Sequence, residues 1–141
     1  MQPRDTRTGS VLEEMIARAL QRGGYLCSQQ VNVGLRLGGG KHLVDFVATD
    51  RAGVSYLISV KWQQVSGTAE QKVPYEAMCL AEAVLASRGE YAKAYLVLGG
   101  DGWKLREFYT GGGLTQHLRH GDLVTILTFE GFVARANRGQ L

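Results

Sequence analysis

Apolar residues near the start of the chain recur at helical spacing. This pattern predicts a helix over residues 10–22, because Ser10 and Glu13 have the spacing of a capping box in front of an apolar series. Gly23 and Gly24 are expected to end that helix. Its apolar face contains Val11, Leu12, Met15, Ile16, Ala19 and Leu20.

The next part of the chain alternates between apolar and polar residues. Three strands are predicted, over residues 25–37, 42–48 and 54–62. Glycine-containing turns at 38–41 and 49–53 separate them. Because both turns are short, we expect the three strands to form an antiparallel meander.

Helical spacing returns over residues 68–87, and Pro74 is expected within the first turn of that helix. Residues 110–121 show no regular pattern. The remaining predicted elements are a strand at 92–98, a short helix at 103–109, a strand at 123–129 and a closing helix at 130–137. The order is therefore αβββαβ followed by a short tail, and we expect a single domain over residues 1–141.

Composition narrows the class of protein without naming a function. The chain has 141 residues, of which 45% are apolar and 21% charged, so an intrinsically disordered chain is excluded. Its 19 glycines follow no strict repeat, which excludes collagen and indicates tight turns. The net charge of +3 is compatible with nucleic-acid binding but does not identify it.

Cysteine usage and hydropathy predict the cellular environment. Cys27 and Cys79 lack the spacing of a metal site, so free thiols in a reducing compartment are expected. No apolar run approaches the roughly 20 residues that a membrane span needs, and residues 1–10 contain no apolar signal segment. We therefore expect a soluble cytoplasmic protein without a membrane partner.

Asp45 and Lys61 are the first residues that indicate chemistry. Folding the hairpin about its turn at 49–53 places Asp45 opposite residues 58–59, while Ser59, Lys61 and Gln63 share one face. A carboxylate that holds Mg²⁺ and a lysine that orients water are suited to phosphodiester hydrolysis. A plain cross-strand ion pair is the alternative.

Two other motifs do not carry a function. Residues 34–41 lack the first glycine of a phosphate-binding loop, since Leu35 stands there, and His42 replaces the required serine or threonine. His117 and His120 are three residues apart, but no further metal ligands surround them in the sequence.

Two short strings resemble a known family. His42-Leu43-Val44-Asp45-Phe46, followed by Ile58-Ser59-Val60-Lys61-Trp62-Gln63, resembles the core of the PD-(D/E)XK nuclease superfamily. The stretch 66–75 resembles a signature of its restriction-endonuclease-like branch, and Glu13 resembles the acid of the family's first helix. The resemblance implies an α/β fold with a restriction-endonuclease-like αβββαβ core, in which helices flank a mixed central sheet.

The sequence departs from the family pattern at two positions. Val44 stands in place of the proline, and Ser59 in place of the acid of the (Asp/Glu)-x-Lys element. Some restriction enzymes of the superfamily have a similar Ser-Val-Lys and take the missing carboxylate from the following helix. Glu70 is favoured here, since its helical phase matches the apolar face, while Glu76 lies about 100° from the centre of that face.

The resemblance implies a Mg²⁺-dependent DNA endonuclease, with Mn²⁺ as a substitute, whose product carries a 5′-phosphate. Asp45, Glu70 and the Val60 carbonyl would bind the metal, and Lys61 would orient the attacking water. Glu13 would assist through metal-bound water, or act only as a helix cap.

The roles of two further polar residues stay open. Gln63 would help position water or phosphate, or be a surface amide, and Lys72 would contact DNA phosphate or be solvated. With no separate DNA-reading domain, we expect a homo-oligomer, a dimer or higher. Because Ser59 lacks a carboxylate, a non-catalytic DNA-binding or assembly subunit is the second hypothesis. An interaction domain without a nucleic-acid role is the third.

Overall fold

The computed structural model describes residues 6–141, with side chains described from Gly9 onward. Helices and strands follow one another in the order α1 (Thr6–Arg22), β1 (Leu26–Leu35), β2 (Lys41–Thr49), β3 (Ser55–Trp62), α2 (Ala69–Ala86), β4 (Tyr91–Gly99), α3 (Arg106–Thr110), β5 (Val124–Thr128) and α4 (Phe129–Asn137). Two single 3₁₀ turns, at Thr115–His117 and Gly121–Leu123, lie within and at the end of the segment for which the sequence showed no regular pattern.

Every helix and strand expected from the hydrophobic pattern is present, and most ends agree within three residues. The first helix differs most, because it begins at Thr6 and not at Ser10. Ser10 and Glu13 therefore lie inside α1, so the capping box predicted from their spacing is wrong. The helix ends as expected, where the Gly23 amide donates to the Ala19 carbonyl at 3.0 Å.

All five strands form one sheet in the order β1-β2-β3-β4-β5. The first three strands are antiparallel, which confirms the predicted meander, whereas β4 and β5 run parallel to β3. The sheet is therefore mixed. The parallel β3–β4 pair is connected through α2, as a crossover between parallel strands requires.

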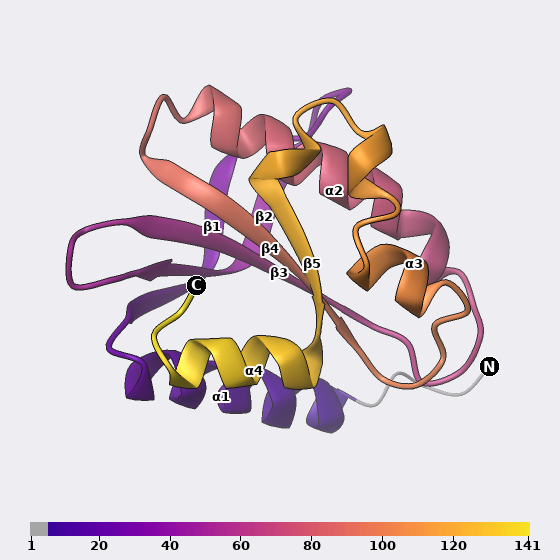
Figure 1. Cartoon of the computed structure of the whole chain (residues 1–141), viewed down its shortest axis with the longest axis horizontal. Coiled ribbons are helices and arrows are strands. Elements are labelled where there is room, and N and C mark those ends of the chain that lie inside the picture. The colour runs from indigo at the N-terminus through magenta and orange to yellow at the C-terminus, as the bar shows by residue number, and fades with distance from the viewer. Residues whose placement is uncertain (1–5) are drawn as a thin grey trace.

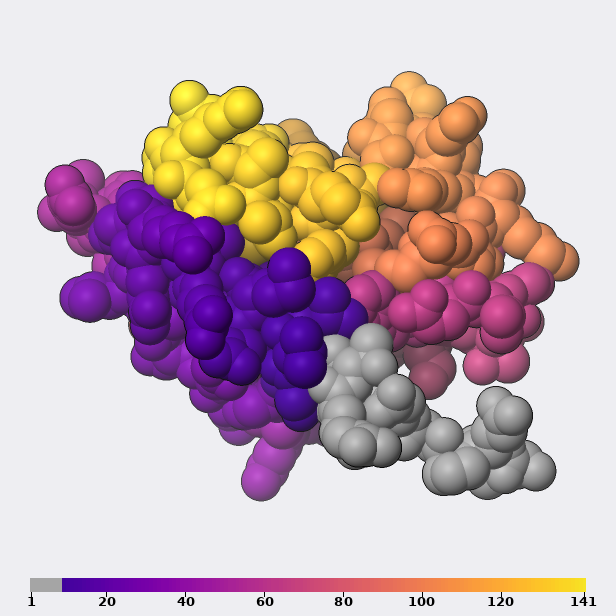
Figure 2. All heavy atoms as spheres, turned by 90° about the horizontal axis from the view of Figure 1, so that it is seen from below, coloured from indigo at the N-terminus to yellow at the C-terminus, as the bar shows by residue number. Residues whose placement is uncertain are grey.

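Helices cover both faces of the sheet (Figure 1). One face packs against α2 and the other against α1 and α4, which lie side by side in Figure 2. Each face has its own apolar core, and together the two cores bury the strands from both sides. The core under α2 includes Val44, Leu57, Val73, Leu80 and Leu96, and the core under α1 and α4 includes Ile16, Phe46, Ile58, Tyr95 and Phe132.

Pro74 lies in the second turn of α2, one turn further in than the sequence led us to expect. A proline lacks the N–H that would donate to the carbonyl four residues earlier, here that of Glu70. The Tyr109 hydroxyl donates to that carbonyl at 3.4 Å instead. The short helix α3 therefore partly compensates for the bond that Pro74 cannot make.

Both cysteines are free, Cys27 half-buried and Cys79 buried, as their spacing predicted. Within the residues that the structure describes, no helix combines the length and the apolar character needed to cross a bilayer.

Glycines at the end of β4 and directly after it allow the chain to pack tightly on the end of β3. A methyl group at Gly99 would lie 2.1 Å from the Trp62 ring, and one at Gly100 would lie 2.4 Å from the Gln63 carbonyl oxygen. The Trp62 ring in turn stacks on Phe129, with a centroid separation of 6.0 Å. This close approach fixes Trp62 at the end of β3.

Substituting Gly99 tests this packing. We expect Gly99→Ala to lower the free energy of unfolding by about 1–3 kcal/mol, because the added methyl group displaces the Trp62 ring. Urea unfolding followed by tryptophan fluorescence measures the effect. Gly67→Ala is the matched control, since a methyl group there meets its nearest neighbour at 3.7 Å. Equal stabilities of the two variants would contradict this account.

Candidate functional site

The strands β2 and β3 separate halfway along their length. Their pairing runs from Thr49 opposite Ser55 to Phe46 opposite Ile58 and then stops. Beyond that point β2 pairs only with β1, and β3 pairs only with β4. The two strands therefore form a fork, and Asp45 and Ser59 are the first residues beyond its closed end.

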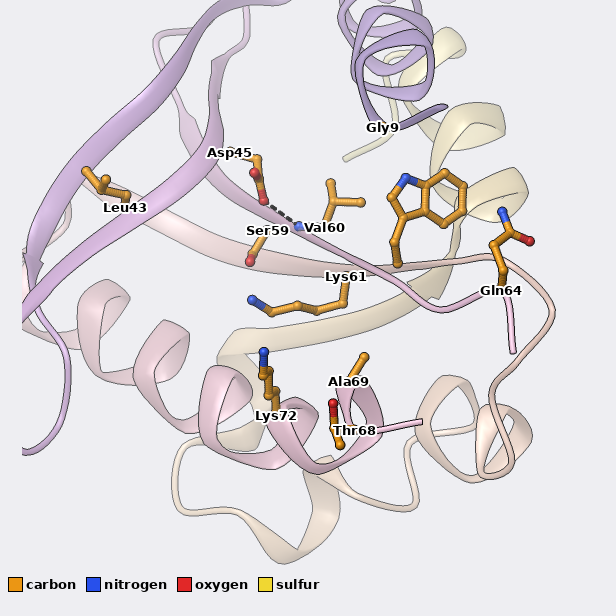
Figure 3. Close-up of a pocket in the computed structure, with 11 residues that line it drawn as sticks. Gly9, Leu43, Asp45, Ser59, Val60, Lys61, Gln64, Thr68, Ala69 and Lys72 are labelled. Carbon is orange, nitrogen blue, oxygen red and sulfur yellow. Dashed lines mark hydrogen bonds between the residues drawn. The ribbon is translucent and has the colours of Figure 1, made fainter. Parts of the chain in front are cut away.

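Asp45 bridges the fork. Its Oδ2 accepts a hydrogen bond from the Val60 amide at 2.7 Å, in place of a backbone partner on β2 (Figure 3). The N–H and C=O of one residue in an extended strand point to the same side, so the Val60 carbonyl also faces the fork. The Gln30 amide donates to Oδ1 of Asp45 at 3.4 Å. Gln30 has a positive φ of 52°, a left-handed conformation that is uncommon for a non-glycine residue.

A cleft of about 720 Å³ opens at this fork. The first turns of two helices border it, through Gly9 of α1 and Ala69 of α2. The amino groups of Lys61 and Lys72 point into the same part of the cleft, facing it from β3 and from α2 (Figure 3). Its other lining residues are Leu43, Asp45, Ser59, Val60, Trp62, Gln64 and Thr68.

Glu76 is a buried carboxylate beside this cleft, with only 2% of its surface exposed. Its Oε1 lies 2.7 Å from Nε2 of His42, and its Oε2 lies 2.7 Å from Nη1 of Arg36. The Lys61 ammonium group is 3.9 Å from the same Oε2. Glu76 therefore connects Lys61 of β3 to two hydrogen-bonding partners, Arg36 and His42, from the β1–β2 hairpin.

The environment of Glu76 keeps its carboxylate ionised. Burial alone would raise the pKa, but hydrogen bonds from His42 and Arg36 and the charge of Lys61 lower the pKa to about 2. An ionised carboxylate only accepts hydrogen bonds, so the Nε2 of His42 carries the proton in this pair. His42 is completely buried, and its Nδ1 has no hydrogen-bond partner within the part of the chain that the structure describes.

Asp45 has the opposite electrostatic environment. Burial raises its pKa above the ordinary value, and the nearby charge of Glu76 raises it further. The Val60 amide, Lys61 and Gln30 oppose this shift without cancelling it. Asp45 is therefore a carboxylate whose charge the protein alone compensates incompletely, which is typical of functional sites.

The helical phase predicted for the two glutamates of α2 is wrong. Glu76, expected away from the apolar face, is buried beside Lys61, while Glu70, expected toward the site, is only half-buried and has no ion pair with Lys61 among the described residues. Neither glutamate is among the described residues that line the cleft. Glu70 accepts hydrogen bonds from the Lys104 amide and from Gln63. The reason is that the β1–β2 hairpin covers one side of α2 and widens its buried face, which the spacing of apolar residues does not show.

Gln63 is also placed differently from both sequence expectations. It is 5% exposed, and its amide donates to the Gly102 carbonyl at 2.8 Å and to Glu70 at 3.4 Å. Its neighbour Gln64 lines the cleft instead. Gln63 therefore links the end of β3 to the loop after β4 through buried hydrogen bonds. It is neither a surface amide nor a residue that lines the cleft.

Glu13 is half-buried on α1 and is absent from the described residues that line the cleft.

Sequence reasoning missed the roles of Arg36 and His42, because nothing in their spacing relates them to Glu76, which lies 40 and 34 residues further along. His42 does precede Asp45 by three residues in the family-like string, which was the one available signal.

Within residues 6–141, no group of three or more His, Cys, Asp or Glu side chains is arranged to hold a metal ion.

The raised pKa of Asp45 predicts a gain in stability when its charge is removed. The folded pKa lies above the unfolded one, so the carboxyl group favours folding at low pH and loses that contribution as pH rises. We expect Asp45→Asn to melt at a higher temperature than the wild type at pH 7. The difference should shrink as pH falls from 7 toward about 4, the ordinary pKa of the group, and vanish below it. Calorimetric melting curves over this pH range provide the test, and a lower melting temperature at pH 7 would contradict it.

The lowered pKa of Glu76 predicts the opposite effect. Its contribution to stability is complete above the ordinary pKa of 4.5 and is lost as pH falls toward about 2. We expect Glu76→Gln to lower the free energy of unfolding at pH 7 by on the order of 3 kcal/mol, because Arg36 and His42 lose their charged partner. Between pH 4.5 and 2 its stability should change less with pH than that of the wild type. Glu82→Gln, at an exposed position of α2, is the control for urea unfolding.

Comparison with known proteins agrees with this geometry. The family model described as a PD-(D/E)XK nuclease superfamily domain matches residues 4–139. A crystal structure of a protein of unknown function, AF1548, is similar with a TM-score of 0.55 and 18% sequence identity. The similarity covers 84% of this chain and 56% of that one, so the chain spans little more than half of that protein's length. A search of curated proteins finds no sequence match. The chain belongs to the PD-(D/E)XK nuclease superfamily.

Proposed function

We propose that this protein is a Mg²⁺-dependent DNA endonuclease that hydrolyses phosphodiester bonds in the cleft at the β2–β3 fork. The observation that carries the proposal is that Asp45 and Lys61 line the cleft at the open end of the fork, with the buried Glu76 carboxylate 3.9 Å from the Lys61 ammonium group. These three residues come from two strands and a helix, and only the fold brings them together.

The residues at the fork fit a magnesium ion by their chemistry. Mg²⁺ prefers oxygen ligands and is usually held by one or two carboxylates, several waters and substrate phosphate oxygens. Asp45, Glu76 and the Val60 carbonyl supply such oxygens, and we assign them as the protein ligands. The low pKa of Glu76 provides a full negative charge at neutral pH. Glu76 thus takes the place that the sequence alone had favoured for Glu70.

The bound metal would supply charge neutralisation at the phosphate and a more acidic water. Lys61 points its ammonium group into the cleft, where it would hold the attacking water by a hydrogen bond. Lys72 faces the same space and would bind a neighbouring phosphate. Ser59, buried at 3% exposure, provides room next to Lys61 but no charge.

A single cleft of this kind cuts one strand at a time. We propose that two copies of the chain act together on duplex DNA, because a two-fold assembly matches the symmetry of a duplex. Cutting of both strands at one position would support this assembly, whereas nicking alone would indicate independent copies.

Incubation of purified protein with supercoiled plasmid and Mg²⁺ tests the activity. We expect Asp45→Ala and Lys61→Ala to nick the plasmid at least about 10²-fold more slowly than the wild type. Lys93→Ala is the control, because Lys93 lies over the Tyr95 ring and does not line the cleft. Equal nicking by all four proteins would exclude the proposed site and point to a contaminating nuclease.

The same assay decides which glutamate serves the site. We expect Glu76→Ala to abolish nicking and Glu70→Ala to retain most of it, since the Glu70 carboxylate accepts hydrogen bonds from the Lys104 amide and Gln63, away from Lys61. Circular dichroism would confirm that both variants fold. Loss of nicking in Glu70→Ala alone would restore the assignment made from the sequence. DNA binding that survives metal chelation, with no cleavage by the wild type, would favour a non-catalytic DNA-binding subunit.

A further inference from the structure

The two strong partners of Glu76 differ in their access to solvent. His42 is fully buried and holds Oε1, whereas the Arg36 side chain is 28% exposed and holds Oε2. Loss of the Arg36 contact would leave the carboxylate anchored by His42. Glu76 therefore has one fixed partner and one that the surroundings can reach.

Arg36 also occupies the oxygen that a metal would need. A magnesium ion lies roughly 2.1 Å from a ligand oxygen. The Arg36 nitrogen lies 2.7 Å from Oε2, so a metal on this oxygen would be within about 5 Å of the guanidinium group. Since Oε1 already accepts the His42 proton, like-charge repulsion from Arg36 opposes metal binding at the remaining oxygen.

The backbone around Arg36 places it at the end of a turn beside the cleft. Arg36 follows the last residue of β1, and its amide donates to the Gly40 carbonyl at 2.9 Å. Gly38, Gly39 and Gly40 all have positive φ, so the turn depends on glycine. Arg36 does not itself line the cleft, but its guanidinium group and the cleft residue Lys61 approach the same oxygen, Oε2 of Glu76, at 2.7 and 3.9 Å.

We propose that Arg36 is a substrate-responsive positioning residue. In the free protein it neutralises Glu76, and when nucleic acid enters the cleft its guanidinium group transfers to a backbone phosphate. A guanidinium group binds phosphate oxygens in the same bidentate way as it binds a carboxylate, so the exchange keeps Arg36 paired. Oε2 of Glu76 then becomes available to the metal. Metal and nucleic acid consequently strengthen each other's binding. The inference rests on the proposed function of this cleft.

Mn²⁺ binding without nucleic acid provides a test that does not depend on turnover. We expect Arg36→Met to bind Mn²⁺ about ten-fold more tightly than the wild type, as measured by the electron paramagnetic resonance signal of free Mn²⁺. Arg36→Lys keeps the charge and should bind Mn²⁺ like the wild type. Arg18→Met is the control, because Arg18 also pairs with a glutamate at 2.7 Å but on the exposed surface of α1.

A hydrolysis-resistant phosphorothioate duplex completes the test. It should raise the Mn²⁺ affinity of the wild type by more than that of Arg36→Met, since the variant has no arginine to release. If Arg36→Met does not fold, Arg36→Gln replaces it, and the wild type with and without the duplex still shows whether the two ligands are coupled. An unchanged or weaker Mn²⁺ affinity in the folded variant would overturn the inference, even where wild-type nicking is intact. Failure of the proposed function appears differently, as a wild type that neither nicks plasmid nor binds Mn²⁺.

Discussion

The hydrogen bond between the Asp45 carboxylate and the Val60 amide is the interaction around which the site is organised. Where two antiparallel strands separate, each loses backbone partners that must be replaced. Asp45 replaces one of them with its side chain, at 2.7 Å. The fork therefore stays open without an unpaired Val60 amide, and the open space receives Lys61 from β3 and the first turn of α2.

Two carboxylates near this fork are stabilised in opposite ways. Glu76 has hydrogen-bonding and cationic partners within the protein, so its charge contributes to folding. Asp45 is desolvated beyond what its partners offset, so its charge opposes folding at neutral pH. A bound cation would offset the uncompensated charge of Asp45 and would compete with Arg36 for the carboxylate of Glu76. The protein thus combines a carboxylate that is ready for a ligand with one that is already paired.

Parts of the structure distant from the cleft also determine its shape. The glycine loop after β4 presses on Trp62 and Gln63 and fixes the direction in which the chain leaves β3. Because only six residues connect that strand to α2, this direction also determines where the first turn of α2 meets the cleft. The contact between Tyr109 and the Glu70 carbonyl supports the same turn, next to Pro74.

The amino-acid sequence by itself determined the order of elements, the antiparallel meander and the location of Asp45 and Lys61 near the same end of the sheet. These features depend on the period of apolar residues and on short turns, both of which are local. The tertiary structure alone decided that Glu76 and not Glu70 lies beside Lys61, that Gln63 is buried, and that Arg36 and His42 hold Glu76. The physical reason is that the β1–β2 hairpin covers one side of α2. Contacts over 34 to 40 residues leave no periodic trace in the sequence.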